Sequence, residues 1–251
     1  MMFLSKQKFY FWFCLFFVTF YGFSLQANTM GTASVKLDWT NFTIERIDTG
    51  YGIPSIIWTS LSEEVVGIIG GFQNSQNKND WSDASINIAT GESELTSIAD
   101  STQLYTEAEL TAPDNVDVIG LVKRTGEFVV SGTGIILFKL PYSFEIAIND
   151  DSFATFLTNT VSLDVINDPI NINQTRWSQN GASLTKTSTV DGIGTWTEDG
   201  YLMASIFFED GEKGILQVEA KTVAHSAVPI PSALILLGSG MIAFLAIKKR
   251  Q

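Results

Sequence analysis

Apolar and polar residues alternate with a period of two along much of the second half of the chain. Every second residue is apolar over 142–148, 161–165, 202–208 and 216–220. Because successive side chains of a β-strand point to opposite faces, this period predicts strands with one face in a core and one in water. No apolar stripe of 12 or more residues has helical spacing between 28 and 227. The pattern therefore predicts an all-β region.

The first half of this region is less regular but contains the same signals. Short strands are expected within 35–47 and over 55–60, 65–70 and 84–90, and 101–112 reads as a strand in preference to a weak helix. Residues 71–83 read as a polar loop. About a dozen short strands in one region favour a single antiparallel β-sandwich or jelly roll over a parallel sheet with crossover helices.

Turn-forming dipeptides separate the predicted strands. Asn180-Gly181 and Asp191-Gly192 are such signals, and Gly132–Gly134 reads as a turn that enters a strand. The segment 207–220 is expected to form a β-hairpin with its loop at Asp210-Gly211.

The first 27 residues have the features of a secretory signal peptide. Lys6 and Lys8 precede an uncharged, strongly aromatic run over 9–23, and Ala27 provides a small residue at a cleavage position. An uncleaved membrane anchor is the alternative. The only cysteine, Cys14, lies in this segment, so the mature protein is expected to have no disulfide and no thiol chemistry.

The region between the two terminal segments, residues 28–227, is more acidic than the whole chain. All 27 acidic residues lie in 28–227 but only 10 of the 15 basic ones do, which gives a net charge of −17 against −12 for the full chain. Such a surface repels nucleic-acid phosphates and anionic lipids, so nucleic-acid binding is excluded. An acidic surface suits solubility outside the cell.

Candidate chemistry in this region is sparse. His225 is the only histidine and stands close to the end of the region, so no histidine-based triad or zinc site is expected. Carboxylate doublets at 63–64, 150–151 and 198–199 read as turns, although a pair facing across a cleft would allow a secreted glycoside hydrolase. The sequence predicts no catalytic residues and no cofactor. Loops 79–83 and 148–152 offer oxygen ligands for Ca²⁺, but a solvated turn is the better interpretation.

Two tryptophans in polar surroundings suggest a glycan site. Trp81 and Trp177 could each stack on a sugar ring if their indoles were exposed on loops of the sandwich. The alternative is that they pack in the core or at its edge, as most tryptophans do.

The C-terminal 24 residues combine prolines, an apolar run and a basic end. Residues 233–247 are uncharged and would span about 22 Å as a helix, and counting from Val228 gives about 30 Å, just enough to cross a bilayer. Lys248, Lys249 and Arg250 would stop transfer and stay in the cytoplasm. Pro229 and Pro231 keep the preceding backbone extended, as a processing enzyme requires.

This tail resembles the PEP-CTERM sorting signal of Gram-negative bacteria, with Ile230 in place of the motif's Glu. The matching residues are Val228, Pro229, Pro231, Ser232 and Ala233, then Gly238 and Gly240, and finally Lys248, Lys249 and Arg250. The resemblance implies processing by an exosortase and association with an exopolysaccharide or biofilm matrix. It predicts a protein held at the inner membrane in transit and then located at the cell surface or outside it. A permanent C-terminal membrane anchor is the alternative.

Overall fold

The computed structural model describes residues 31–91, 93–110, 116–149, 155–168, 178–188 and 193–226. These residues form thirteen β-strands and no helix, which confirms the all-β prediction. The strands lie within one compact unit, Asn28–Ala227. Every pair of neighbouring strands is antiparallel.

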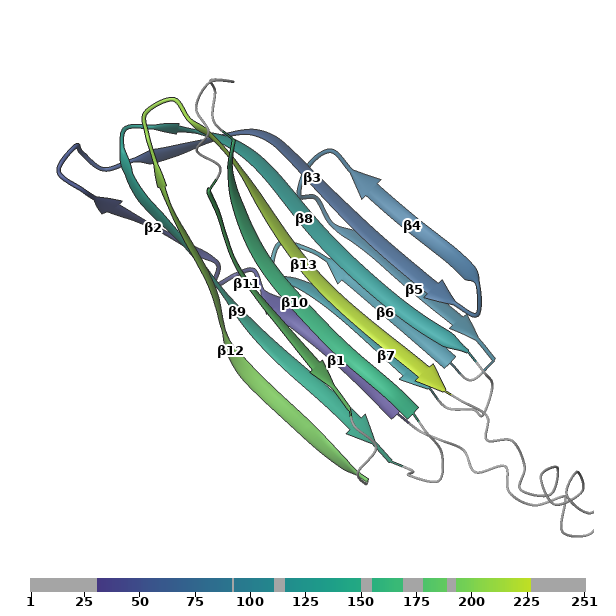
Figure 1. Cartoon of the computed structure of the whole chain (residues 1–251). Helices are drawn as coiled ribbons and strands as arrows, with labels where there is room; N and C mark the ends of the chain where they lie inside the picture. Colours follow the sequence, from purple (N-terminus) through teal and green to yellow (C-terminus); the bar gives the residue numbers. More distant parts are fainter. Residues whose placement is uncertain are drawn as a thin grey trace, which may run out of the picture. The chain divides into compact units, whose positions relative to one another are not determined.

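The strands form two sheets that pack face to face (Figure 1). In order, the first sheet contains β12 (Gly194–Phe208), β9 (Gly134–Ile148), β1 (Gly31–Asp38), β7 (Gln103–Leu110), β6 (Ser93–Ala99) and β5 (Ala84–Thr90), with β2 (Thr43–Asp48) also paired to β9. The second contains β11 (Ser178–Thr187), β10 (Thr155–Asp168), β13 (Lys213–Ser226), β8 (Asp117–Ser131), β3 (Ser55–Ile69) and β4 (Phe72–Lys78). This two-sheet antiparallel arrangement agrees with the predicted sandwich.

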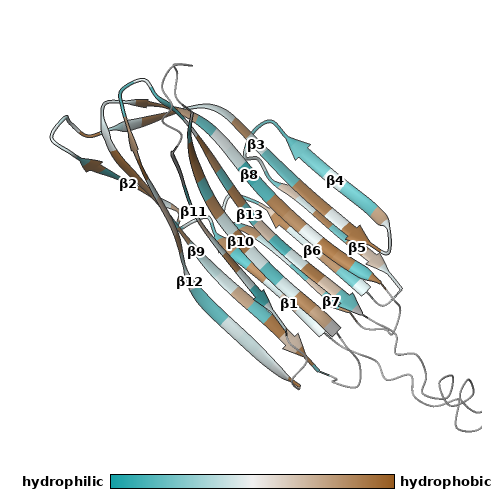
Figure 2. Ribbon diagram, in the orientation of Figure 1, coloured by the Kyte–Doolittle hydropathy of each residue, from teal (hydrophilic) through white to brown (hydrophobic). Residues whose placement is uncertain are grey.

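The core lies between the sheets and is built from the alternating residues. Phe138, Leu140 and Ile146 of β9 are buried, as are Leu202 and Phe208 of β12. Figure 2 shows the corresponding alternation of hydrophobic and hydrophilic residues along the strands. Since full burial of such a side chain contributes roughly 1.5–3 kcal/mol, the period-two pattern stabilises this packing.

A seam of buried polar groups also joins the two sheets. Asn159 of β10 donates from Nδ2 to the carbonyl oxygens of Ser34 (2.7 Å) and Glu145 (3.0 Å) in the opposite sheet. The single hydroxyl hydrogen of Thr222 on β13 is shared between Asn159 Oδ1 (2.9 Å) and the carbonyl oxygen of Thr106 (3.3 Å). These bonds satisfy polar atoms that would otherwise be costly to bury.

Two expected loops are strands at the edge of the second sheet. Phe72–Lys78, within the predicted polar loop 71–83, pairs with β3, and Asn180-Gly181 lies inside β11 instead of forming a turn. Both strands have an exposed, polar character because an edge strand buries few of its side chains. The sequence pattern of a half-buried strand is therefore missing from them.

The turn at Asp210-Gly211 is confirmed, but the expected hairpin is wrong. β12 belongs to the first sheet and β13 to the second, so the turn carries the chain across the sandwich. The N–H of Gly211 donates to the Val130 carbonyl (2.8 Å), and the N–H of Gly132 donates to Asp210 Oδ1 (2.6 Å). These bonds tie the turn to the end of β8, which lies beside β13.

Candidate functional site

The most unusual feature of the core is an ion pair between Glu63 and Arg124. The two residues are directly opposite one another on β3 and β8, and Arg124 Nε donates to Glu63 Oε2 at 2.6 Å. Arg124 is 1% exposed and Glu63 is 2% exposed. Ionised side chains are rarely buried to this extent unless they are paired.

A β-bulge in β3 explains why Glu63 faces inward. The register with β8 shifts between Trp58 and Ser60, so that Thr59 is the additional residue. Trp58 before the bulge and Glu63 after it both face the core, although one position is even and the other odd. The predicted turn at 63–64 is therefore wrong, because both glutamates lie inside β3.

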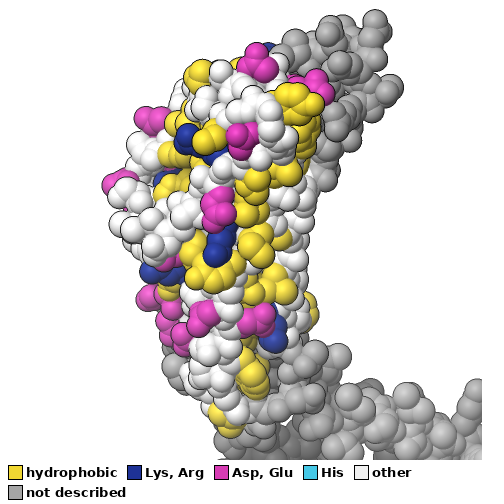
Figure 3. Space-filling model, turned by 90° about the vertical axis from the view of Figure 1, so that its left-hand side faces the viewer, with side chains coloured by type: hydrophobic (Ala, Val, Ile, Leu, Met, Phe, Trp, Pro, Cys, Tyr) yellow, Lys and Arg dark blue, Asp and Glu magenta, His cyan; other side chains and the backbone are white. Residues whose placement is uncertain are grey.

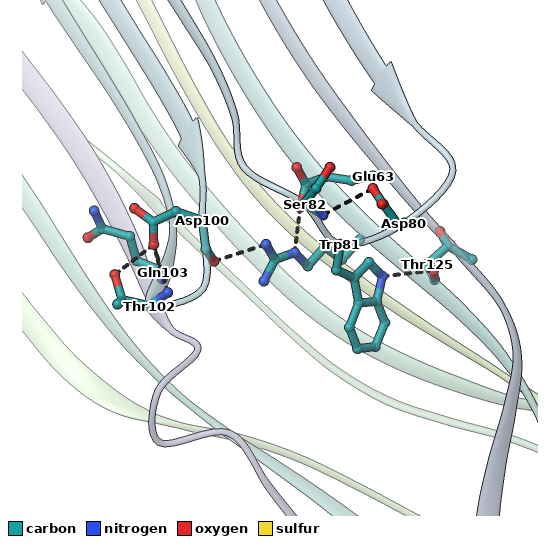
Figure 4. Close-up of polar contacts among 9 residues, drawn as sticks. Glu63, Asp80, Trp81, Ser82, Asp100, Thr102, Gln103 and Thr125 are labelled. Carbon is teal, nitrogen blue, oxygen red and sulfur yellow. Dashed lines mark hydrogen bonds and ion pairs between the residues drawn. The ribbon is translucent and has the colours of Figure 1, made fainter.

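Three other segments lie against the guanidinium of Arg124. Figure 4 shows two of them, the turn at Asp100 and the loop with Trp81, together with Glu63. Nη2 donates to the carbonyl oxygen of Asp100 at 2.9 Å. The guanidinium carbon lies 4.8 Å from the Trp39 ring centroid and 6.0 Å from that of Trp81. Cation–π attraction strengthens when the groups are removed from water, so these rings stabilise the buried charge.

The turn between β6 and β7 positions the Asp100 carbonyl. Asp100 Oδ1 accepts hydrogen bonds from the N–H (2.7 Å) and hydroxyl (2.6 Å) of Thr102 and from the N–H of Gln103 (2.9 Å). Burial works to raise the pKa of the Asp100 carboxyl, but these hydrogen bonds outweigh burial and lower that pKa. The N–H of Trp39 also donates to the Thr102 carbonyl at 2.9 Å, which fixes the indole beside the same turn.

Trp81 closes the edge of the cluster. It lies in the loop between β4 and β5 and packs edge-on against Trp39 and Trp58, with ring centroids 5.2 Å away in each case. Its Nε1 donates to the Thr125 carbonyl at 3.1 Å. Gly126 leaves room for the rings, because a Cβ there would lie 2.5 Å from Trp58 and 2.8 Å from Trp81. This packing favours the core role over glycan stacking for Trp81.

The chemistry available to this cluster is restricted by its burial. Among the described residues, Glu63 Oε1 and Arg124 Nη1 have no hydrogen-bond partner. Desolvation, opposed by the hydrogen bond and charge of Arg124, raises the pKa of Glu63. Since both side chains are enclosed, we assign the pair the structural role of joining β3, β8 and the β6–β7 turn. The sequence carried no signal for this pair beyond the opposite charges of two residues 61 positions apart.

The carboxylate doublets do not come together. Glu63 and Glu64 lie in β3 near one edge of the sandwich, whereas Glu198 and Asp199 lie in β12 at the other edge. Glu198 is not in a turn, and its Oε2 accepts a hydrogen bond from Lys186 Nζ at 3.3 Å. The doublet at 150–151 lies outside the described residues.

His225 and the expected calcium loop 79–83 lie on the surface of the sandwich. His225 is on β13, and its Nδ1 is 2.5 Å from Asp117 Oδ1 of β8 on the surface. In loop 79–83, Asp80 Oδ1 accepts the N–H of Ser82 at 3.2 Å, and hydrogen bonds from Ser82 lower the pKa of Asp80. Within the described parts of the chain, no three His, Cys, Asp or Glu side chains are grouped to hold a metal ion. Loop 148–152 is only partly described.

Other predicted sites lie outside the described residues. These are Trp177, the signal segment with Ala27, and the tail from Val228 to Gln251. In the ranges that are described, no helix is long and apolar enough to span a membrane.

Comparison with known proteins adds no assignment. The chain matches no protein-family model, and the search of curated proteins found no match.

Proposed function

We propose that this chain is an exported cell-surface or extracellular-matrix protein, delivered by exosortase-type processing of its C-terminal tail. Support comes from the order of the sequence features: a signal-like segment ending at Ala27, an acidic β-rich region, and a PEP-CTERM-like tail. The β-sandwich acts in this proposal as a binding or structural domain. Its partners are exopolysaccharide or other matrix proteins, and it requires no cofactor.

One structural observation carries the proposal. The last strand of the described residues, β13, ends at Ser226, and the proline motif begins only two residues later at Val228. Proline restricts its own backbone and that of the residue before it, and it lacks an amide donor for a sheet or helix. A recognition motif directly after the final strand suits removal of the tail without loss of any part of the sandwich.

The attachment points of both terminal segments also suit this role. Gly31 pairs with Leu110 and Ile148, and the last strand residue, Ser226, pairs with Thr155. These pairings put the beginning of β1 and the end of β13 at the same end of the sandwich (Figure 1). The opposite end, which carries the β2–β3 loop, would then be available to partners.

Cell fractionation tests the proposal. We expect the full chain expressed in an exosortase-containing Gram-negative host to reach the cell surface or medium. A Pro229→Ala/Pro231→Ala variant should instead accumulate in the inner membrane. Tyr51→Ala is the matched control, because this side chain is 78% exposed in the β2–β3 loop. Equal distribution of the proline variant and the control would contradict processing at the proline motif.

A further inference from the structure

The outer edge of β12 offers backbone polar groups that no strand pairs within the described structure. β12 is the last strand of the first sheet and pairs with β9 alone. In an antiparallel pair, alternate residues direct their N–H and C=O groups to the partner or away from it. The Ser205 carbonyl accepts a hydrogen bond from Asn180 Nδ2 of β11 at 2.7 Å, so Ser205 points away from β9. Because the register of β12 with β9 is unbroken, the backbone N–H and C=O groups of Thr195 and Thr197 also point away from β9.

A hollow of about 330 Å³ lies at this edge, beside Thr195 and Thr197. Its apolar lining includes Phe144 and Ile146 of β9, which are 3% and 2% exposed. Trp196 also lines it and is 41% exposed, which is unusual for so large an apolar side chain. Figure 3 views this side of the domain and shows hydrophobic side chains exposed among acidic and basic ones.

Charged groups complete the lining. Lys186 of β11 and Glu198 of β12 both line the hollow, and their side chains are 48% and 38% exposed. Their ion pair bridges the two sheets with Nζ and Oε2 3.3 Å apart. Burial and the neighbouring Glu198 carboxylate raise the pKa of Tyr142. Lys186 therefore holds the Glu198 carboxylate at the hollow through the ion pair.

We propose that this hollow binds one ring of a neutral polysaccharide. A pyranose ring has an apolar face of C–H groups and a rim of hydroxyls. The Trp196 indole suits the apolar face, while the edge backbone groups, Lys186 and Glu198 can donate to and accept from the hydroxyls. The volume lies at the small end of the range for ligand pockets, as a single ring requires.

Other ligand classes fit less well. A wholly apolar ligand would remove the Lys186–Glu198 ion pair and the edge backbone groups from water without replacing the hydrogen bonds that they make to water, and the Glu198 carboxylate disfavours an anion. A peptide strand added to β12 would need a longer open edge. β11 meets this edge at Asn180–Ser205 and at Lys186–Glu198, which leaves only the short stretch before Glu198 open, whereas strands commonly have about 5–6 residues.

This inference rests on the proposed function in one respect only: the proposed function places the chain in a matrix that would supply the sugar. Binding is measured on the purified chain, independently of its location or processing, so failure of one proposal leaves the other standing.

The test is calorimetric titration of the full chain in detergent micelles with cellotetraose, laminaritetraose, mannotetraose and chitotetraose. We expect at least one of them to bind and Trp196→Ala to weaken that binding by about tenfold or more. Trp196→Tyr, which keeps an aromatic face, should retain most of the affinity. Tyr201→Ala is the control, because Tyr201 is an exposed aromatic residue of the same strand that does not line the hollow.

Urea unfolding of each variant shows that it is folded. The proposal is overturned if none of the four sugars binds, or if Trp196→Ala binds as the wild type does. Binding of an extended Thr-Val octapeptide in place of the sugars would assign this edge to peptides and would equally overturn it.

Discussion

Arg124 and Glu63 form an ion pair in the interior of the sandwich, with 2.6 Å between Nε and Oε2. The pair connects neighbouring strands of one sheet, and the arginine also binds the Asp100 carbonyl in a turn of the other. Taking two charges out of water costs several kcal/mol per ion, so the pair contributes specificity of packing more than net stability. We infer that it fixes how the two sheets are aligned at this edge.

Removing only the arginine should be strongly destabilising. Arg124→Met leaves the Glu63 carboxylate buried without its partner, and we expect the free energy of unfolding to fall by about 3–5 kcal/mol. The double variant Glu63→Leu/Arg124→Met should recover most of this loss. Urea unfolding of the variants measures both effects. Lys186→Ala, which removes an exposed ion pair, is the control and should cost less than about 1 kcal/mol.

The raised pKa of Glu63 predicts a pH-dependent stability difference from Glu63→Gln. A carboxyl whose folded-state pKa is raised adds stability below its unfolded value, near 4.5, and that contribution disappears as pH rises through the folded-state pKa. The wild type should therefore lose stability relative to Glu63→Gln as the pH rises above about 4.5. Urea midpoints at several pH values measure this difference. A relative gain by the wild type over this range would mean that Arg124 lowers the pKa.

Trp81 should behave as a core residue. Trp81→Ala opens a cavity beside Trp39 and Trp58 and uncovers Arg124, so we expect a loss of about 3–5 kcal/mol in unfolding free energy. Trp81→Phe keeps part of the packing but loses the indole hydrogen bond to the Thr125 carbonyl, at a smaller cost of about 1–3 kcal/mol. Urea unfolding followed by circular dichroism checks both values. A Trp81→Ala variant as stable as the wild type would contradict this role.

Gly120 is expected to tolerate no side chain. A Cβ at this position would lie against Thr106 Oγ1 and 2.9 Å from Ser97 Oγ, where these two hydroxyls share a buried hydrogen bond of 3.1 Å. Gly120→Ala should lower the unfolding free energy by about 1–3 kcal/mol. Gly194→Ala is the matched control, because its Cβ would meet Trp196 at an ordinary 3.6 Å. Equal urea midpoints for the two variants would refute the packing argument.

The sequence predicted the strands whose two faces have different environments. β9, β12 and β13 alternate over 142–148, 202–208 and 216–220, because there one face of each strand lies in the core and the other faces outward. β4 is exposed along most of its length, so its polar sequence resembled a loop. The Asp210-Gly211 turn was recognisable, but its hydrogen bonds to Val130 of β8 and to Gly132, just after β8, are long-range contacts that direct the chain into the other sheet.

The candidate sites were less predictable than the strands. Glu63 was expected in a turn. The bulge at Thr59 decides which way its side chain points, but a bulge interrupts the alternation of apolar and polar residues and so cannot be recognised from the sequence pattern. Trp81 looked exposed because its flanking residues are polar, whereas its partners Trp39 and Trp58 come from distant segments. The Trp196 hollow depends on the edge position of β12, which follows from strand order and not from local sequence.

Intact-mass measurement of the protein recovered from the cell surface or medium tests the central claim most directly. The proposed sorting predicts a chain that begins after Ala27 and lacks the segment after about Pro231, because the tail serves as a sorting handle. A mass that still includes residues 233–251 would contradict exosortase-type processing and would identify the tail as a permanent anchor.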